Sequence, residues 1–203
     1  MAKYNDDRNF TDYVHKNVSI PNIYPLMGWI EGEIDADELN DLDMNNGIDA
    51  VIVDRNSSGK TLQYRYRDAY YKNNTDATLR YQRPHNSNKD RHNSEFFKIE
   101  ADYLLYGISN GKKFSDKLYT NTNFLKWAVL DLSKLFNLID INQIVIDRSL
   151  SGYQCIKINI EGTNKMICPV LSNKDQSSNF VPFDIPILRE LFHDDVVISS
   201  YGF

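Results

Sequence analysis

Residues 47–67 constrain the fold most, because they contain two segments of strand character joined by a short polar turn. The first segment, residues 48–54, is a mostly apolar run of strand length, which is typical of a strand covered on both faces. Arg-Asn-Ser-Ser-Gly follows, and we expect Gly59 to supply the positive φ of a hairpin turn. The second segment alternates, with Leu62, Tyr64 and Tyr66 on one face and Gln63, Arg65 and Arg67 on the other. An antiparallel hairpin with one apolar and one polar face is therefore predicted.

The rest of the chain alternates between helical and strand patterns, which predicts an α/β fold. The helical patterns cover residues 9–18 with Thr11 as the N-cap, 19–29, 35–47, 121–139 and 183–195, with a single helical turn at 95–100. Further strands are expected at residues 77–83, 101–109, 143–147 and 195–203, and residues 152–171 are expected to form a hairpin that turns at residues 161–164. We predict one domain over residues 1–203, with a mixed central β-sheet flanked by helices. The alternative is a small C-terminal, β-rich subdomain that begins at about residue 143.

Composition and motifs narrow the class of protein. No apolar run is long enough to cross a membrane and the N-terminus lacks the apolar core of a signal peptide, so a cytoplasmic protein is expected. Cys155 and Cys168 lie in strand-like segments and are expected to be buried thiols. The chain has no phosphate-binding loop motif, no dinucleotide-binding motif and no G-x-S-x-G motif, so nucleotide hydrolysis and hydrolase-triad chemistry have no support.

Charge is distributed unevenly along a chain whose net charge is −5. Residues 31–54 are acidic, and residues 60–91 lean basic. One use of such an arrangement is to hold metal ions beside a polyanion, and the alternative is a pair of differently charged solvated faces.

Asp49, Gln63 and Arg65 are the candidate site residues of the hairpin. Asp49 stands where the apolar strand begins, and Gln63 and Arg65 lie two residues apart on the polar face of the next strand. If Asp49 points to the same face, a carboxylate, an amide oxygen and a guanidinium converge. Hard oxygen donors bind Mg²⁺, and a cation beside the metal stabilises charge that grows on a scissile phosphate. This pattern predicts a phosphodiester-cleaving site, and the alternative is a polar sheet face whose arginines pair with nearby acids.

The segment Gly-Ile-Asp at 47–49, followed by Gln-x-Arg at 63–65, resembles the PD-(D/E)XK nuclease superfamily. Members of that superfamily place an acid at the start of one strand and (D/E)xK on the next. The resemblance implies a restriction-endonuclease-like core, hydrolysis of DNA, and Mg²⁺ or Mn²⁺ as the cofactor. It implies that Asp49, Gln63 and Arg65 are catalytic and that Asp49 and Gln63 hold the metal. Members often add a carboxylate from the first helix, for which Glu33 and Glu31 are the candidates here, with Asp12 ranked below them.

Two departures from the pattern of the superfamily leave two functions open. Gln63 brings no charge, and Arg65 carries a guanidinium that stays protonated and cannot act as a base, so a metal-bound hydroxide would be the nucleophile. The chain is then either a metal-dependent nuclease or a catalytically inactive nuclease-fold protein. The inactive protein would bind nucleic acid or a protein partner, as a viral or mobile-element accessory or inhibitor protein does. Some nucleases of this class work as dimers, which leaves a homodimer open. The expected DNA phosphate contacts are Arg67, Arg80, Arg83 and Lys98.

Overall fold

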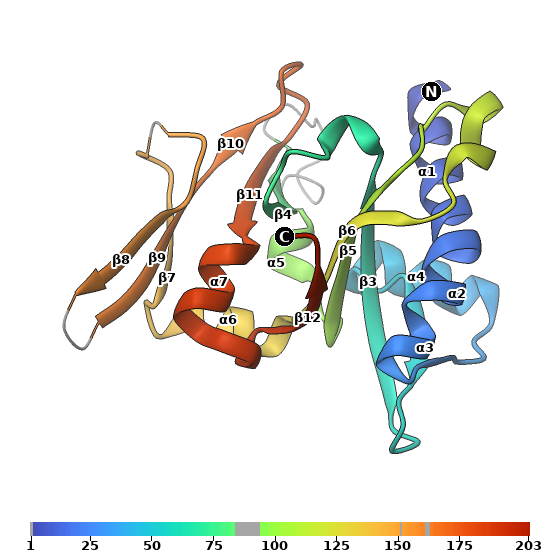
Figure 1. The fold of residues 1–203 in the computed structure, drawn as a ribbon, viewed down its shortest axis with the longest axis horizontal. Helices are drawn as coiled ribbons and strands as arrows, with labels where there is room; N and C mark the ends of the chain where they lie inside the picture. The colour runs from blue at the N-terminus through green and yellow to red at the C-terminus, as the bar shows by residue number, and fades with distance from the viewer. Residues whose placement is uncertain (1, 84–93, 151, 161–162) are drawn as a thin grey trace.

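The structure, a computed structural model, describes residues 2–83, 94–150, 152–160 and 163–203. Its main sheet has the strand order β1-β2-β3-β5-β6-β12, and Figure 1 shows helices on both sides of it. Neighbouring strands of this sheet are antiparallel, except that β3 and β5 are parallel. The fold is therefore mixed α/β with a mixed sheet flanked by helices, as the sequence predicts. The strands of the main sheet are β1 (Ile30–Glu31), β2 (Ala50–Val53), β3 (Gly59–Arg67), β5 (Tyr103–Ser109), β6 (Phe124–Asp131) and β12 (Val197–Tyr201).

One face of the main sheet is covered by the N-terminal helices. Apolar residues of these helices pack on Leu62 and Tyr66 of β3 and on Leu105 of β5. His15 lies in this layer, where its ring stacks on Tyr64 at 3.9 Å between centroids and its Nδ1 hydrogen-bonds the Tyr66 hydroxyl at 2.9 Å. The packing of Tyr64 and Tyr66 on the apolar face is thus confirmed. The helices of this layer are α1 (Ala2–Val14), α2 (Ile20–Asn22) and α3 (Tyr24–Met27), with a π-helical segment at His15–Ser19 between α1 and α2.

The opposite face packs on two smaller sheets and two helices. Their buried side chains join Leu104 of β5 and Leu130 of β6 in one continuous cluster, which also includes Ile144, Met166 and Cys168. The strand order is β10-β11-β4 in one sheet and β7-β9-β8 in the other. The elements of this layer are β4 (Asp76–Gln82), β7 (Ile144–Asp147), β8 (Ile156–Ile160), β9 (Thr163–Pro169), β10 (Leu171–Ser172), β11 (Asn179–Asp184), α6 (Leu132–Asp140) and α7 (Ile185–Phe192). The hairpin of β8 and β9 is present, and Glu161 and Gly162 of its expected turn lie outside the described residues.

The prediction of one helix over residues 121–139 is wrong. Residues 124–131 form β6, and only the part from Leu132 onward is helical, as α6. Asp131 separates the two, because its side chain accepts a hydrogen bond from the Lys134 N–H at 3.0 Å and so caps the helix. Residues 127–130 lie between β5 and β12, where both faces of the strand are buried. A continuous apolar run of this kind does not distinguish a central strand from a buried helix.

Two local predictions also need correction. Thr11 is not an N-cap: it lies inside α1, and its hydroxyl donates to the Asp7 carbonyl oxygen at 3.0 Å. The residue with positive φ in the 54–59 turn is Ser57 (φ 59°) rather than Gly59, which belongs to β3. The Asp54 carboxylate shapes that turn by accepting from the Asn56 and Ser58 N–H groups. The strand expected at residues 77–83 is present as β4, and it pairs with β11 rather than with a strand of the main sheet.

The β2–β3 hairpin leaves part of β3 open along one edge. Residues 50–53 of β2 pair with residues 59–62 of β3, and β3 then continues to Arg67 with β5 on its other side. Beside the open part lie α4 (Ala36–Asn46), α5 (Glu95–Lys98) and residues 7–12 of α1. Among the described residues, no helix is both long and apolar enough to cross a membrane.

Candidate functional site

A cleft of about 600 Å³ lies beside the open part of β3. Residues 63–67 of β3 line it together with residues of α1 and α4. Tyr71 comes from the 3₁₀-helical segment Ala69–Tyr71, and Lys113 comes from the loop after β5. It therefore joins segments that are far apart in the sequence. Charged residues of both signs line it, namely Asp7, Arg8, Asp12, Asp43, Asp49, Arg65, Arg67, Asp68, Arg80 and Lys113.

Gly47 and the pairing of β2 with β3 place Asp49 in this cleft. Gly47 ends α4 in the left-handed conformation (φ 62°), which turns the chain from the helix toward β2. The Asp49 N–H then donates to the Leu62 carbonyl oxygen at 2.8 Å, one residue before β2 begins. The carboxylate turns toward the open edge of β3, where its Oδ2 accepts from Gln63 Nε2 at 2.7 Å and from the Tyr64 N–H at 2.8 Å. Asp49 and Gln63 thus meet, as the sequence predicts.

Burial is the main influence on the Asp49 carboxyl. It raises the pKa of Asp49 well above the usual value, and the nearby carboxylates of Asp43 and Glu95 raise that pKa further. The Tyr64 N–H and Arg65 act in the opposite direction. Burial also raises the pKa of Asp12 across the cleft, with Arg8 lowering it and Asp43 raising it. These carboxyls interact with one another, and a cation in the cleft would favour their charged forms.

Gln63 supplies a buried oxygen without a partner. Its side chain is 7% exposed, and its Oε1 accepts no hydrogen bond, whereas its Nε2 is used by Asp49. A Cβ atom at Gly47 would lie 3.3 Å from this oxygen, so the glycine keeps bulk away from it. Unsatisfied polar atoms are rare in protein interiors, and a hard cation is one group that an amide oxygen accepts.

The donors in the cleft suit a divalent cation in type but are not gathered around one point. Asp49 and Gln63 would hold such an ion, and Asp43 and Asp12 are the carboxylates in the same cleft that could add ligands. In the part of the chain that the structure describes, no three His, Cys, Asp or Glu side chains are placed so that they could hold one ion. Glu33 follows β1 in an exposed position and is not among the residues that line the cleft.

Arg65 lies beside Asp49 but is engaged from the other side. Its Nη1 donates to the Thr78 carbonyl oxygen at 2.8 Å, and its Nη2 forms an ion pair with the Glu95 carboxylate. Glu95 Oε2 also accepts from the Arg80 N–H at 3.1 Å, which ties α5 to β4. Burial lowers the pKa of Arg65 to about 10, and Glu95 opposes that shift. Arg65 therefore stays charged at neutral pH, with its charge matched by Glu95.

The four expected DNA contacts separate into two groups. Arg67 and Arg80 line the cleft. Arg67 donates to the Thr78 hydroxyl at 3.1 Å and lies over the Tyr71 ring, 5.3 Å from its centroid. Arg83 follows β4 and does not line the cleft, and Lys98 donates to the Met44 carbonyl oxygen in the last turn of α4. Lys98 therefore stabilises the end of a helix.

Sequence reasoning missed the partners that come from distant segments. Asp43 appears in the sequence only as one acid among many in residues 31–54, and its place on α4, six residues before Asp49, was the available signal. Glu95 lies 30 residues after Arg65, and no local pattern links the two. Arg8 and Lys113 carry no signal beyond their charge.

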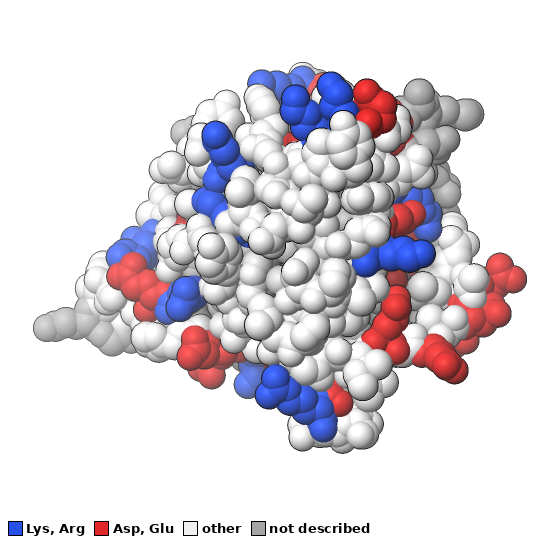
Figure 2. Space-filling model, turned by 45° about the vertical axis from the view of Figure 1, so that its right-hand side comes forward, with Lys and Arg blue, Asp and Glu red and all other residues white. Residues whose placement is uncertain are grey.

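The surface carries no single basic band on the face drawn in Figure 2. Acidic side chains gather toward one edge of that face, and Lys and Arg side chains lie in several separate places. The positive charge of the cleft thus comes from the basic residues that line it rather than from a continuous basic surface on this face.

Comparisons of the chain with protein-family models, with curated proteins and with solved structures find no match.

Proposed function

We propose that the cleft beside β3 binds DNA and hydrolyses its phosphodiester bonds with a divalent cation, Mg²⁺ or Mn²⁺. One observation carries the proposal: Asp49 and Gln63 are hydrogen-bonded to each other in a cleft, beside Arg65, and the oxygen of Gln63 is buried without a partner. The restriction-endonuclease-like core implied by the D…QxR pattern belongs to the same proposal. The position of the acid just before β2, and of Gln-x-Arg on the antiparallel strand β3, supports it.

The residues around Asp49 orient its carboxylate so that it could bind a cation. The Tyr64 N–H and the Gln63 amide hold the Asp49 side chain in one orientation, and both bonds use the same carboxylate oxygen, Oδ2. A buried acid with a raised pKa is a frequent feature of functional sites. When bound, the cation would supply Lewis-acid activation of the phosphate and of a water molecule.

Positive side chains in the cleft would position the phosphates. Arg67, Arg80 and Lys113 line the cleft, and contacts of this kind orient a strand without reading its sequence. Arg65 is held by Glu95 and Thr78, so its guanidinium is fixed beside Asp49 and contributes a pre-organised positive charge.

The dimensions of the cleft favour a single strand. A volume of about 600 Å³ falls in the range of small-ligand pockets, roughly 300–1,000 Å³, and admits a short stretch of one strand rather than a duplex. Tyr71 lines the cleft next to Arg67, and a tyrosine ring beside an arginine offers a surface on which a base can stack.

A second function, DNA binding without cleavage, is favoured by a different observation. The described residues present no ready-made group of three ligands for an ion, and Glu95 already balances the charge of Arg65. In that case the same cleft holds the strand through Arg67, Arg80 and Lys113, and the Asp49 carboxylate only accepts the hydrogen bonds from Gln63 and the Tyr64 N–H.

The test compares a labelled single-stranded oligonucleotide with the duplex of the same sequence, in Mg²⁺, in Mn²⁺ and in EDTA. We expect metal-dependent cleavage of the single strand, reduced by roughly 100-fold or more in Asp49→Asn, as when other charge-stabilising groups are removed. Glu33→Gln is the matched control, because it removes a carboxylate outside the cleft and should leave cleavage unchanged.

Binding is measured in parallel by fluorescence anisotropy as the salt concentration is varied. Arg67→Ala should weaken binding and reduce the slope of log K against log salt by about 0.7 for a single strand, whereas Arg83→Ala should change neither. Salt-sensitive binding by a wild-type protein that cleaves nothing would support the second function. A protein that neither cleaves nor binds would refute both.

A further inference from the structure

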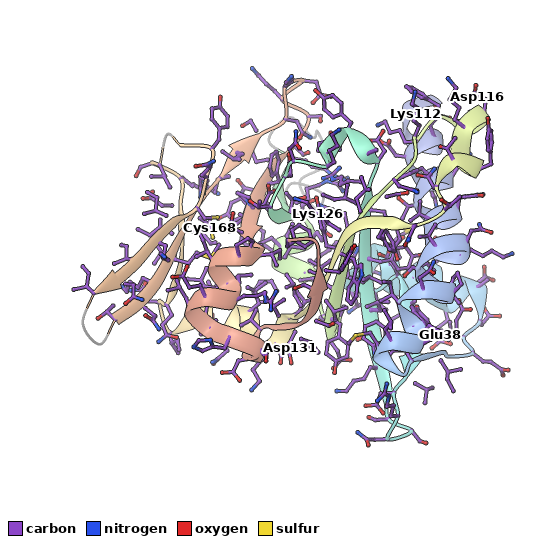
Figure 3. All side chains as sticks on the ribbon, in the orientation of Figure 1. Glu38, Lys112, Asp116, Lys126, Asp131 and Cys168 are labelled. Carbon is purple, nitrogen blue, oxygen red and sulfur yellow. The ribbon has the colours of Figure 1, made fainter. Side chains whose placement is uncertain are left out.

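Two thiols on neighbouring strands lie close enough to react with each other. The Sγ atoms of Cys155 and Cys168 are 3.7 Å apart, and both cysteines are free. Strand β8 pairs antiparallel with β9 from Ile156 opposite Ile167, so the next residues in each direction, Cys155 and Cys168, face each other across the pair. Figure 3 labels Cys168 on β9, on the side of that strand that approaches β11.

The two cysteines differ in their access to solvent. Cys168 is fully buried in the core, whereas Cys155 is half-buried. Cys155 also lines a second cleft of about 350 Å³, together with Tyr153, Gln154 and Pro182. Its Sγ lies 3.2 Å from the Pro182 carbonyl oxygen, to which the thiol donates. A small oxidant can therefore reach one sulfur directly and the other only through the first.

We propose that Cys155 and Cys168 form a site of reversible oxidation, at which a peroxide converts the two thiols into a disulfide that joins β8 to β9. The Cys155 thiolate attacks one peroxide oxygen, and the O–O bond breaks to give a Cys155 sulfenic acid and one water or hydroxide. The Cys168 sulfur then attacks the Cys155 sulfur, the S–O bond breaks, and a second water leaves with the proton of Cys168. The balance is two thiols and one hydrogen peroxide to one disulfide and two waters.

Geometry and burial assign the roles of the two cysteines, with Cys155 attacking the peroxide and Cys168 attacking the resulting sulfenic acid. A disulfide requires about 2.05 Å between the sulfurs, and a pair at 3.7 Å on facing strands reaches it by side-chain rotation. Cys168 is also the less exposed of the two sulfurs, and the hydrogen bond with Cys155 and burial raise the pKa of its thiol, so it is the resolving partner. The disulfide removes the Cys155 hydrogen bond to Pro182 on β11 and replaces it with a covalent bond to β9. Oxidation thus changes the bonding partner of the Cys155 side chain from β11 to β9, at the edge of the second cleft.

The test treats reduced wild-type protein with hydrogen peroxide in stoichiometric steps, under native conditions and in urea. We expect a loss of two hydrogens by intact-mass spectrometry, a 155–168 linkage in the non-reduced peptide map, faster formation in the native protein than in urea, and reversal by dithiothreitol. The Tm should rise on oxidation of the wild type and not of Cys155→Ser.

Two variants separate the steps of the reaction. Cys168→Ala should stop at the Cys155 sulfenic acid, which dimedone traps, and Cys168→Ser serves the same purpose if the alanine variant does not fold. Wild-type protein that gives only sulfinic acid at Cys155, only intermolecular dimers, or a disulfide that forms no faster in the native state than in urea would overturn the proposal. The result does not depend on nuclease activity, so either proposal can fail alone.

Discussion

Glu95→Ala is expected to destabilise the protein more than any other change to a charged residue near the cleft. The side chains of Arg65 and Glu95 are only 15% and 8% exposed, so removal of the glutamate leaves a buried guanidinium without its counter-charge. It also removes the acceptor of the Arg80 N–H. Breaking a buried ion pair by loss of one partner costs about 3–5 kcal/mol. With a urea m-value of about 2.5 kcal/mol/M, the denaturation midpoint should fall by about 1–2 M.

The assay is equilibrium urea denaturation followed by tryptophan fluorescence, because Trp29 and Trp127 are both buried. The control is the double variant Arg65→Met with Glu95→Leu, in which neither charge remains. Replacing both partners of a buried pair by apolar residues is often neutral, so the double variant should be more stable than Glu95→Ala alone. A midpoint shift below about 0.3 M in Glu95→Ala, or a double variant that shows the summed loss of the two single changes, would refute the reasoning.

Two further predictions concern groups whose pKa is shifted by burial. Asp49→Asn should raise the urea midpoint of unfolding at neutral pH. The pKa of Asp49 is raised above 3.8 in the folded protein, so its ionisation costs stability as the pH rises from 3.8 through the folded-state pKa. Equal midpoints for the wild type and the variant at pH 7 would contradict this. Burial lowers the pKa of His15 from 6.5 to about 4. The free energy of unfolding of the wild type should therefore fall by about 3 kcal/mol relative to that of His15→Gln as the pH drops from 6.5 to 4. Parallel curves of unfolding free energy against pH for the two proteins would contradict this.

Local periodicity explains which parts of the fold the sequence predicts. The alternation in residues 60–67 specifies a strand with two chemically different faces, and Tyr66 and Arg65 lie on the faces expected. The pairing of Asp49 with Gln63 follows from a hairpin whose register is set by a short turn. Information of this kind spans about twenty residues, and within that span the strand, its two faces and the contact of Asp49 with Gln63 are confirmed, whereas the positive φ expected at Gly59 is found at Ser57.

Features that depend on distant contacts could not be read in the same way. Residues 124–131 have the apolar character of a helix core but lie between two strands, and only tertiary pairing makes them β6. Strand β4 has the alternation expected of a main-sheet strand and joins β11, 100 residues later in the chain, instead. Glu33 lies outside the cleft, whereas Asp43, which is closer to Asp49 in sequence, lines it from α4. Asp12 reaches the cleft on α1, whose docking no local pattern specifies.

Glutamine at position 63 has a physical reason within this cluster. The Gln63 amide lies 2.7 Å from the Asp49 carboxylate and donates to it, whereas a carboxylate at position 63 would place a second negative charge at that distance. Two carboxylates that close cannot both ionise in a buried site unless a cation lies between them. Glu95 already contributes a buried negative charge, which Arg65 balances. The cluster therefore holds Asp49, Glu95 and Arg65 with one net negative charge at most, and a hydrogen-bonded amide keeps it folded without a metal. The same amide leaves its oxygen unsatisfied beside Asp49, so position 63 holds a neutral hydrogen-bond donor where a carboxylate would add to the buried negative charge.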